Sequence, residues 1–421
     1  MAELESVLPT ISPSCQIIAS SPDVVIFDSS ESIDASTLIL RLGGTIKIGV
    51  LLNDSPINMT TEALEGLLLR HLTERYGEST GRITIGFSVS SLSQTPKKIQ
   101  GRMSKLLYTL RNNFLSVKKQ WRAEHDSLRI VTPQKGEPTL SSVVVTKNHL
   151  TTSRGTEFLF LIDDSGQALL ARTLAVQPFE AYTERDFGRP AREMTTGLLP
   201  PKLAQVMINL AQHPPSDYPK IWDPFCGFGT IVQEALLMGY RDVHGSDISP
   251  ARMADTRANL EWLAQQLTLT LPPLDTVLHH HDATMPAPWP EGTIDAIITE
   301  GYLGPVIHHT SSPADIAKAT QAVEKLYRAV FPHLHCTLKV SGAFVLTLPV
   351  WFTGRDTSTT LPLESLIKDL FSIQSPISTK HHPWLSLTSR KTIIYHRPGQ
   401  LVGREIVILK KLPTAGAATT T

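Results

Sequence analysis

The second half of the sequence alternates short strand-like runs with helical runs, and this alternation constrains the fold more than any other feature. The strand-like runs are rich in apolar and β-branched residues, and the stretches between them carry apolar residues at helical spacing. This pattern indicates an α/β domain with a mostly parallel sheet and helices on both faces. It predicts strands at 220–222, 243–246, 276–279, 294–299 and 342–348, and helices at 229–238, 250–263 and 315–330. Two late runs, 392–395 and 404–410, predict an antiparallel C-terminal hairpin.

The first half lacks this alternation and is typical of a smaller α+β assembly. Residues 37–50 alternate apolar positions around Gly43-Gly44, which predicts strands, and 61–76 carry leucines along one side of a predicted helix. Further strands are predicted at 141–145 and 158–162, followed by a turn at Asp163-Asp164-Ser165-Gly166.

The net charge of zero, from 39 basic and 39 acidic residues, conceals a segregated first half. Residues 1–96 are acidic, whereas 97–165 hold twice as many basic as acidic residues. Leu106, Leu107 and Leu110 predict an amphipathic helix there, whose basic face is either a solvated surface or an RNA-binding surface interleaved with Tyr108, Phe114 and Trp121. The candidate RNA-binding residues are Lys97, Lys98, Arg102, Lys105, Arg111, Lys118, Lys119 and Arg122.

The remaining composition points to a cytoplasmic protein without a bound metal. The three cysteines, Cys15, Cys226 and Cys336, have no disulfide or zinc spacing, and the histidines have no cysteine or carboxylate at zinc spacing. The most apolar stretch, 340–352, is shorter than the roughly 20 residues of a membrane span. The N-terminus shows no secretion signal, and residues 413–421 are expected to be a disordered tail.

A glycine-containing turn follows the first strand of the second half. It reads Asp223-Pro-Phe-Cys-Gly-Phe-Gly-Thr230 and leads directly into a helix, and Asp247 ends the next strand. Glycines let a ligand approach the backbone, a helix N-terminus offers free N–H groups, and an acid at the end of the second strand can accept hydrogen bonds from ribose hydroxyls. The turn lacks the third glycine of the dinucleotide fingerprint and the Gly-Lys-Ser/Thr of a phosphate loop, so neither NAD nor ATP is favoured.

This turn resembles motif I of S-adenosylmethionine-dependent amino-methyltransferases. The resemblance implies a Rossmann-like class I methyltransferase domain that binds S-adenosyl-L-methionine. Glu300-Gly301-Tyr302-Leu303-Gly304 stands where the family has its catalytic Asp/Asn-Pro-Pro-Tyr/Phe motif, which makes Glu300 and Tyr302 the candidate catalytic residues. Under the other alignment, Leu303 takes the position of the aromatic residue. The candidate cofactor-binding residues are Asp223, Pro224, Cys226, Gly227, Gly229, Thr230, Asp247, Ile248, Asp282 and Ala283.

A second resemblance precedes the turn. Residues 172–192 and 197–211, with Leu199-Pro200-Pro201-Lys202 opening a predicted helix, resemble the connector of THUMP-containing tRNA guanosine-N2 methyltransferases of the archaeal and eukaryotic tRNA guanosine-10 type. The resemblance implies tRNA as the substrate, and some relatives need a small activating protein partner. Arg185, Asp186, Arg189 and Arg192 of the connector are expected mainly in surface or interdomain ion pairs.

Together these observations predict five segments: an N-terminal α+β, ferredoxin-like region at 1–80, a THUMP-like RNA-binding region at 81–168, a connector at 169–200, the methyltransferase domain at 201–412 and the tail at 413–421. The predicted activity is methylation of N2 of a guanosine in tRNA. Two alternatives remain open, namely a DNA adenine or cytosine amino-methyltransferase and an RNA-binding homologue that has lost catalysis.

Overall fold

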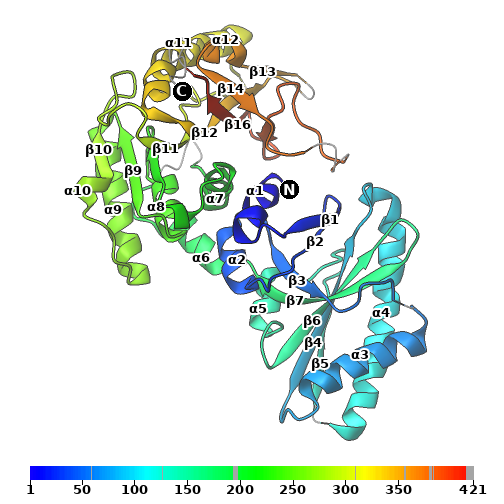
Figure 1. The fold of residues 1–421 in the computed structure, drawn as a ribbon. Helices are drawn as coiled ribbons and strands as arrows, with labels where there is room; N and C mark the ends of the chain where they lie inside the picture. Colours follow the sequence, from blue (N-terminus) through cyan, green and yellow to red (C-terminus); the bar gives the residue numbers. More distant parts are fainter. Residues whose placement is uncertain are drawn as a thin grey trace, which may run out of the picture.

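A computed structural model describes residues 1–57, 59–125, 127–192, 198–308, 310–354, 357–378, 382 and 384–413. Figure 1 shows two α/β assemblies, each built on its own sheet, with the N-terminal helix α1 between them. The predicted tail lies outside the described residues apart from Pro413. No helix in the described ranges combines the length and apolar character needed to cross a membrane.

The C-terminal sheet is mostly parallel, as predicted. Its order is β10-β9-β8-β11-β12-β16-β14, with β13 beside β12 and β15 beside β16. The strands β10, β9, β8, β11 and β12 pair in parallel, whereas β16 is antiparallel to β12, β14 and β15. The strands are β8 (Lys220–Asp223), β9 (Asp242–Asp247), β10 (Leu278–His280), β11 (Ile294–Glu300), β12 (Leu338–Phe352), β13 (Ser358–Thr360), β14 (Phe371–Gln374), β15 (Ile393–Tyr395) and β16 (Val402–Lys411).

The predicted antiparallel C-terminal hairpin forms, but its second strand does not lie at the end of the sheet. β15 and β16 do pair, but β16 lies inside the sheet between β12 and β14 and runs along β12 from Trp351 to Ala343. The strand predicted at 276–279 is also shorter, because the chain forms the single-turn helix α10 (Leu274–Val277) before β10 begins.

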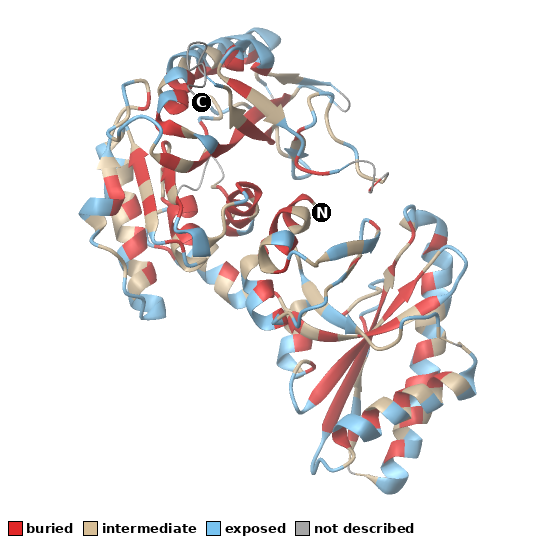
Figure 2. Ribbon diagram, viewed as in Figure 1, coloured by how far each residue is buried: buried red, intermediate tan, exposed pale blue. Residues whose placement is uncertain are grey.

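Helices cover both faces of this sheet. Successive strand residues point to opposite faces, so Ile221 packs with α7 and α8, whereas Trp222 packs with α11 and α12. Figure 2 shows the strands as the most continuously buried part of the domain. The helices are α7 (Pro201–Leu210), α8 (Thr230–Leu237), α9 (Pro250–Leu267), α11 (Pro313–Thr337) and α12 (Leu363–Ile367), and a 3-10 turn spans Pro215–Asp217.

The front sheet is mixed, with the order β3-β7-β6-β4-β5. The long helices α3 and α4 pack on it through one buried cluster that includes Leu68, Phe87, Phe114 and Phe158. The elements are β3 (Lys47–Leu51), α3 (Thr61–Tyr76), β4 (Ile83–Ser91), α4 (Pro96–Glu124), β5 (Leu128–Val131), α5 (Ser142–Lys147), β6 (Gly155–Ile162) and β7 (Ala168–Val176). The proposed boundary at residue 80 stays a prediction, and α3 and β4 on its two sides share this core.

Two segments predicted as strands are helices. Residues 141–145 belong to α5, whose cap Ser141 accepts a hydrogen bond from the Val144 amide at 3.3 Å. Residues 37–41 belong to α2 (Ala35–Arg41), which Asp34 caps by accepting from the Ser36 amide at 2.9 Å. A capping side chain satisfies an amide that the first helical turn leaves unpaired, and this local bond outweighs the apolar pattern in so short a segment.

The N-terminal segment joins the two assemblies. It comprises α1 (Ala2–Ile11), the antiparallel strands β1 (Gln16–Ser20) and β2 (Val25–Asp28), and α2. The buried Glu3 carboxylate accepts hydrogen bonds from the amides of Gly43 and Gly44 and from Asn209 of α7, each at 2.8 Å. The connector adds α6 (Phe179–Thr183) and a π-helical turn, Glu184–Gly188, that lead to the C-terminal domain.

Candidate functional site

The glycine turn lies between the end of β8 and the start of α8, as predicted. Gly227 and Gly229 have positive φ angles of 53° and 80°, a region that residues with a side chain rarely adopt. A Cβ at Gly229 would also lie 2.5 Å from Thr256 Cγ2, whereas a Cβ at Gly227 would meet no atom closer than 3.9 Å. The backbone at Gly227 therefore stays open to an approaching ligand.

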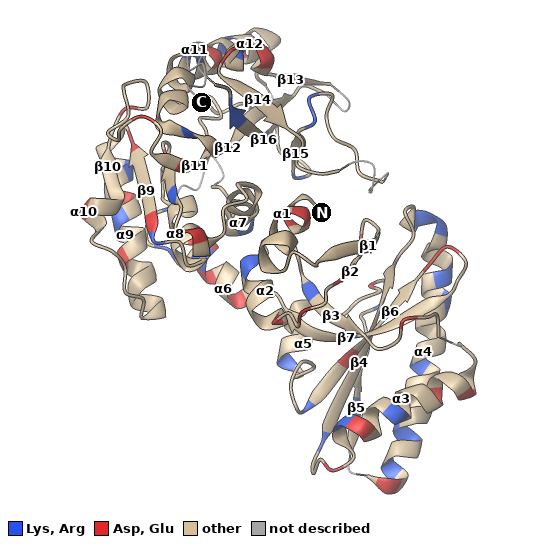
Figure 3. Ribbon diagram, viewed as in Figure 1, with Lys and Arg blue, Asp and Glu red and all other residues tan. Residues whose placement is uncertain are grey.

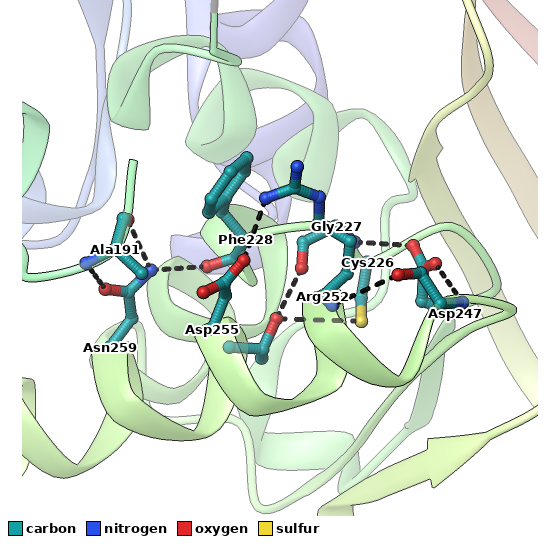
Figure 4. Close-up of polar contacts among 10 residues, drawn as sticks. Ala191, Cys226, Gly227, Phe228, Asp247, Arg252, Asp255 and Asn259 are labelled. Carbon is teal, nitrogen blue, oxygen red and sulfur yellow. Dashed lines mark hydrogen bonds and ion pairs between the residues drawn. The ribbon is translucent and has the colours of Figure 1, made fainter. Parts of the chain in front are cut away.

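Asp247, at the end of β9, accepts a hydrogen bond from the backbone of this turn (Figure 4). One carboxylate oxygen accepts from the Gly227 amide at 3.1 Å and the other from the Ser249 amide at 2.9 Å. A carboxylate has about four acceptor positions, so both oxygens keep capacity for further donors such as ligand hydroxyls. The next residue, Ile248, is 62% exposed at the same edge.

Asp282 and Ala283 follow β10, the neighbouring parallel strand. The register pairs His280 of β10 with Asp247 of β9, which brings the ends of the two strands together. Asp282 accepts from the amide and hydroxyl of Thr284, and these two bonds lower the pKa of its carboxyl, which stays ionised. Ala283 is buried beneath it.

Two side chains of α9 that the sequence pattern does not single out hold the turn in shape. Thr256 donates its hydroxyl proton to the Gly227 carbonyl at 2.7 Å. Asn259 donates to the carbonyls of Phe228 and Ala191 and accepts from the Ala191 amide, so it fastens the connector to the turn (Figure 4). Their three-residue spacing on a helix is common in any sequence and does not single them out.

A cavity that is partly open to solvent lies beside the turn. It brings together residues from β8, the turn, α8 and β11, and its lining residues are Leu198, Leu199, Asp223, Phe225, Cys226, Gly227, Phe228, Thr230, Ile231 and Glu300. Residues 193–197 of the connector lie outside the described part of the chain.

Asp223 is a buried acid in the cavity wall. Its carboxylate accepts from the Thr299 hydroxyl at 2.7 Å and from the Phe225 amide at 3.1 Å. Burial raises the pKa of Asp223 to about 7, against the effect of these two hydrogen bonds. Burial likewise raises the pKa of the Cys226 thiol, so Cys226 is a neutral packing residue, as expected.

Glu300 ends β11 at the opposite wall and forms an ion pair with Arg404 of β16, with Nε and Oε1 2.5 Å apart. Burial raises the pKa of Glu300, and Arg404 opposes that shift. The following Gly301 lies against Tyr327, because a Cβ there would lie 1.8 Å from the Tyr327 hydroxyl oxygen. Proline at position 301 would clash in the same way. Tyr302 is 45% exposed.

The predicted basic face lies on α4, in the front assembly (Figure 3). Seven of the eight candidate residues are exposed and Lys118 is half-buried. Of the three aromatic residues expected on this basic face, Phe114 and Trp121 are instead buried in the core of the sheet. Only Tyr108 is exposed, at 70%. The helix is thus amphipathic as predicted, and its outer face is basic with one exposed ring.

Part of the C-terminal assembly matches a known family model. Residues 189–267 match the family model described as the RMKL-like methyltransferase domain. With the sheet order and the glycine turn, this match confirms the predicted Rossmann-like methyltransferase fold for the C-terminal half.

At the level of single proteins, the chain is 33% identical over 231 residues to the tRNA (guanine(10)-N2)-dimethyltransferase of Methanothermobacter thermautotrophicus, covering 55% of this chain and 58% of that protein. The chain thus spans less than two thirds of that relative. Among solved structures it is similar to TrmN from Thermus thermophilus (15% identity, TM-score 0.48, 97% and 96% of the two chains). It is also similar to geranyl diphosphate C-methyltransferase from Streptomyces coelicolor (14% identity, TM-score 0.32, 51% and 79%).

Proposed function

We propose that this protein is an S-adenosylmethionine-dependent RNA methyltransferase that methylates the exocyclic N2 of a guanosine in tRNA. The observation that carries the proposal is the glycine turn with its open backbone at Gly227, closed by Asp247 and set beside a cavity that holds Asp223 and Glu300. The similarity to the RMKL-like domain and to the archaeal tRNA methyltransferase supports the same activity.

The residues around the turn fit this cofactor. Asp247 has spare acceptor capacity for the ribose hydroxyls, and Asp282, held ionised at the next strand, can accept from the adenine amino group. The sulfonium supplies an activated methyl group when bound, so the protein mainly contributes proximity and orientation. The remaining cofactor contacts are assigned to Asp223, Pro224, Cys226, Gly227, Gly229, Thr230, Ile248 and Ala283.

Glu300 and Tyr302 are proposed to act on the target base. A carboxylate that accepts a hydrogen bond from the exocyclic amine orients the nitrogen lone pair, and the ion pair with Arg404 fixes that carboxylate at the cavity wall. The half-exposed ring of Tyr302 can stack on a base that has been turned out of its helix.

The basic face of α4 is proposed to bind the tRNA backbone, because lysine and arginine side chains that neutralise phosphates release counterions. The proposal places the reaction in the cytoplasm. The proposal also includes a small activating protein partner. Experiments with the purified protein alone will show whether it binds its ligands without that partner.

The test combines labelled cofactor with unmodified tRNA or duplex DNA, followed by mass spectrometry of the nucleosides. N2-methylguanosine from tRNA is the expected product. Methyl transfer to DNA alone favours the DNA amino-methyltransferase alternative. Cofactor binding without transfer to either favours the inactive homologue, for which the engagement of Glu300 by Arg404 is the specific argument.

The Glu300→Gln variant tests the catalytic role of Glu300. It is expected to lower turnover by roughly 100-fold or more while leaving the cofactor Kd within about twofold, because the amide keeps the shape and loses the charge. Full turnover by this variant would refute the catalytic assignment.

A further inference from the structure

Arg189, at the end of the connector's π-helical turn, has unpaired donors in a buried position. The residue is 2% exposed, and its Nη1 donates to the Thr230 hydroxyl at 2.8 Å. Its Nε and Nη2 are buried and have no hydrogen-bond partner among the described residues. A buried charge without an acceptor is costly, so a buried guanidinium normally has one.

The neighbouring Arg185 shows how the same connector satisfies a half-buried arginine. Its Nε and Nη2 both donate to the Glu234 carboxylate, at 2.7 and 3.2 Å. Burial lowers the pKa of Arg189, and the nearby acids Asp186, Glu234 and Glu300 oppose that shift without forming an ion pair with it among the described residues. Arg185 thus forms an ion pair between the connector and the C-terminal domain, as expected. For Arg189 the same expectation is wrong, because its side chain is buried and has no ion pair among the described residues.

The guanidinium is hydrogen-bonded to a residue that lines the cavity. Thr230 lines that cavity and is the first residue of α8, whose first-turn amides point toward the same end. Two residues beyond Arg189, both backbone groups of Ala191 are fixed by Asn259 (Figure 4). An arginine fork next to a helix N-terminus is suited to a carboxylate or another small anion.

We propose that Arg189 binds the α-carboxylate of the methionine part of the cofactor, an inference that rests on the proposed function. The carboxylate is the one anionic group of S-adenosylmethionine, whose sulfonium and ammonium are cations. The acids Asp223 and Glu300 in the cavity wall suit those cations, whereas Arg189 and the start of α8 suit the anion. Arg189 is therefore a cofactor-positioning residue of the connector.

Decarboxylated S-adenosylmethionine tests this assignment, because it keeps the sulfonium and the ammonium and lacks the carboxylate. Calorimetric titration without RNA gives the Kd of each compound. Wild-type protein is expected to prefer S-adenosylmethionine by about 10- to 100-fold, the range for hydrogen bonds to a charged group. Arg189→Met, close in length but uncharged, is expected to bind both compounds equally, and Arg189→Lys to recover part of the preference.

Arg192→Met is the matched control, since Arg192 lies three residues further on and is exposed. It should keep the wild-type preference. A wild-type preference below twofold overturns the inference without any variant, and so does an unchanged preference in a folded Arg189→Met protein. If wild-type protein binds neither compound, the proposed cofactor itself is wrong, which is a different result.

Discussion

At the scale of single residues, one contact from a distant helix restricts position 301 to glycine. The chain passes Tyr327 so closely after β11 that position 301 has no room for a Cβ, and the aromatic Tyr302 follows at the surface. The candidate catalytic residues Glu300 and Tyr302 thus stand on the two sides of a glycine whose position leaves no room for a side chain. The identity of residue 301 follows from Tyr327, which lies on α11 and has no detectable relation to it in the sequence.

Asp223 gives a pH-dependent prediction. Its pKa is about 7 in the folded protein and near 4 in an unfolded chain, so the folded state holds the proton more tightly. This contribution to stability is fully present below about pH 4 and is lost as the pH rises through about 7. Without cofactor, the free energy of unfolding should fall over this window by at most about 1.4 kcal/mol per pH unit from this group.

Urea unfolding followed by tryptophan fluorescence from pH 4 to 8 measures this slope. Asp223→Asn should flatten it, whereas Asp28→Asn, at an exposed position, should leave it unchanged. An equal slope in wild type and Asp223→Asn would contradict the assigned burial effect.

At the scale of elements, the basic face of α4 predicts a local effect on RNA binding. Reversing the charges of Lys97, Lys98, Arg102 and Lys105 to glutamate should weaken tRNA binding by at least about tenfold and reduce its salt dependence, because fewer counterions are released. Cofactor affinity should not change, since none of the four residues lines the cavity.

Filter binding at several salt concentrations provides the measurement. The control reverses Lys318 and Lys325, two exposed lysines of α11 on the C-terminal assembly. Equal losses in both variants would mean that net charge, rather than α4, determines the affinity.

The elements also show what the sequence can and cannot predict. The strands β8, β9 and β11 and the helices α3 and α8 follow from apolar periodicity, and the glycine turn follows from residue types with special backbone freedom. The pattern predicts strands where the short helices α2 and α5 form, because in six or seven residues a single cap outweighs the pattern. Contacts such as Glu300 with Arg404 depend on β16 entering the sheet beside β12, and chain order does not reveal that placement.

At the scale of the whole molecule, Glu3 connects the N-terminal segment to the C-terminal domain. Its carboxylate satisfies the amides of Gly43 and Gly44 as well as Asn209. Glu3→Ala leaves these donors unpaired in a buried position and should lower the free energy of unfolding by about 2 to 4 kcal/mol. Thermal unfolding by calorimetry measures the loss, with the exposed Glu31→Ala as control. Equal stability of the two variants would show that Glu3 does not hold the assemblies together.

The place of β16 in the sheet also sets an order of events during synthesis. Every strand of the front sheet has been made by residue 176, but the C-terminal sheet cannot close until residue 411, because β16 separates β12 from β14. Domains generally fold as units as the chain emerges from the ribosome. The front assembly is therefore expected to fold while the C-terminal half is incomplete, and α1, which precedes α7 by about 190 residues in the chain, must wait for α7 before it reaches its final neighbours.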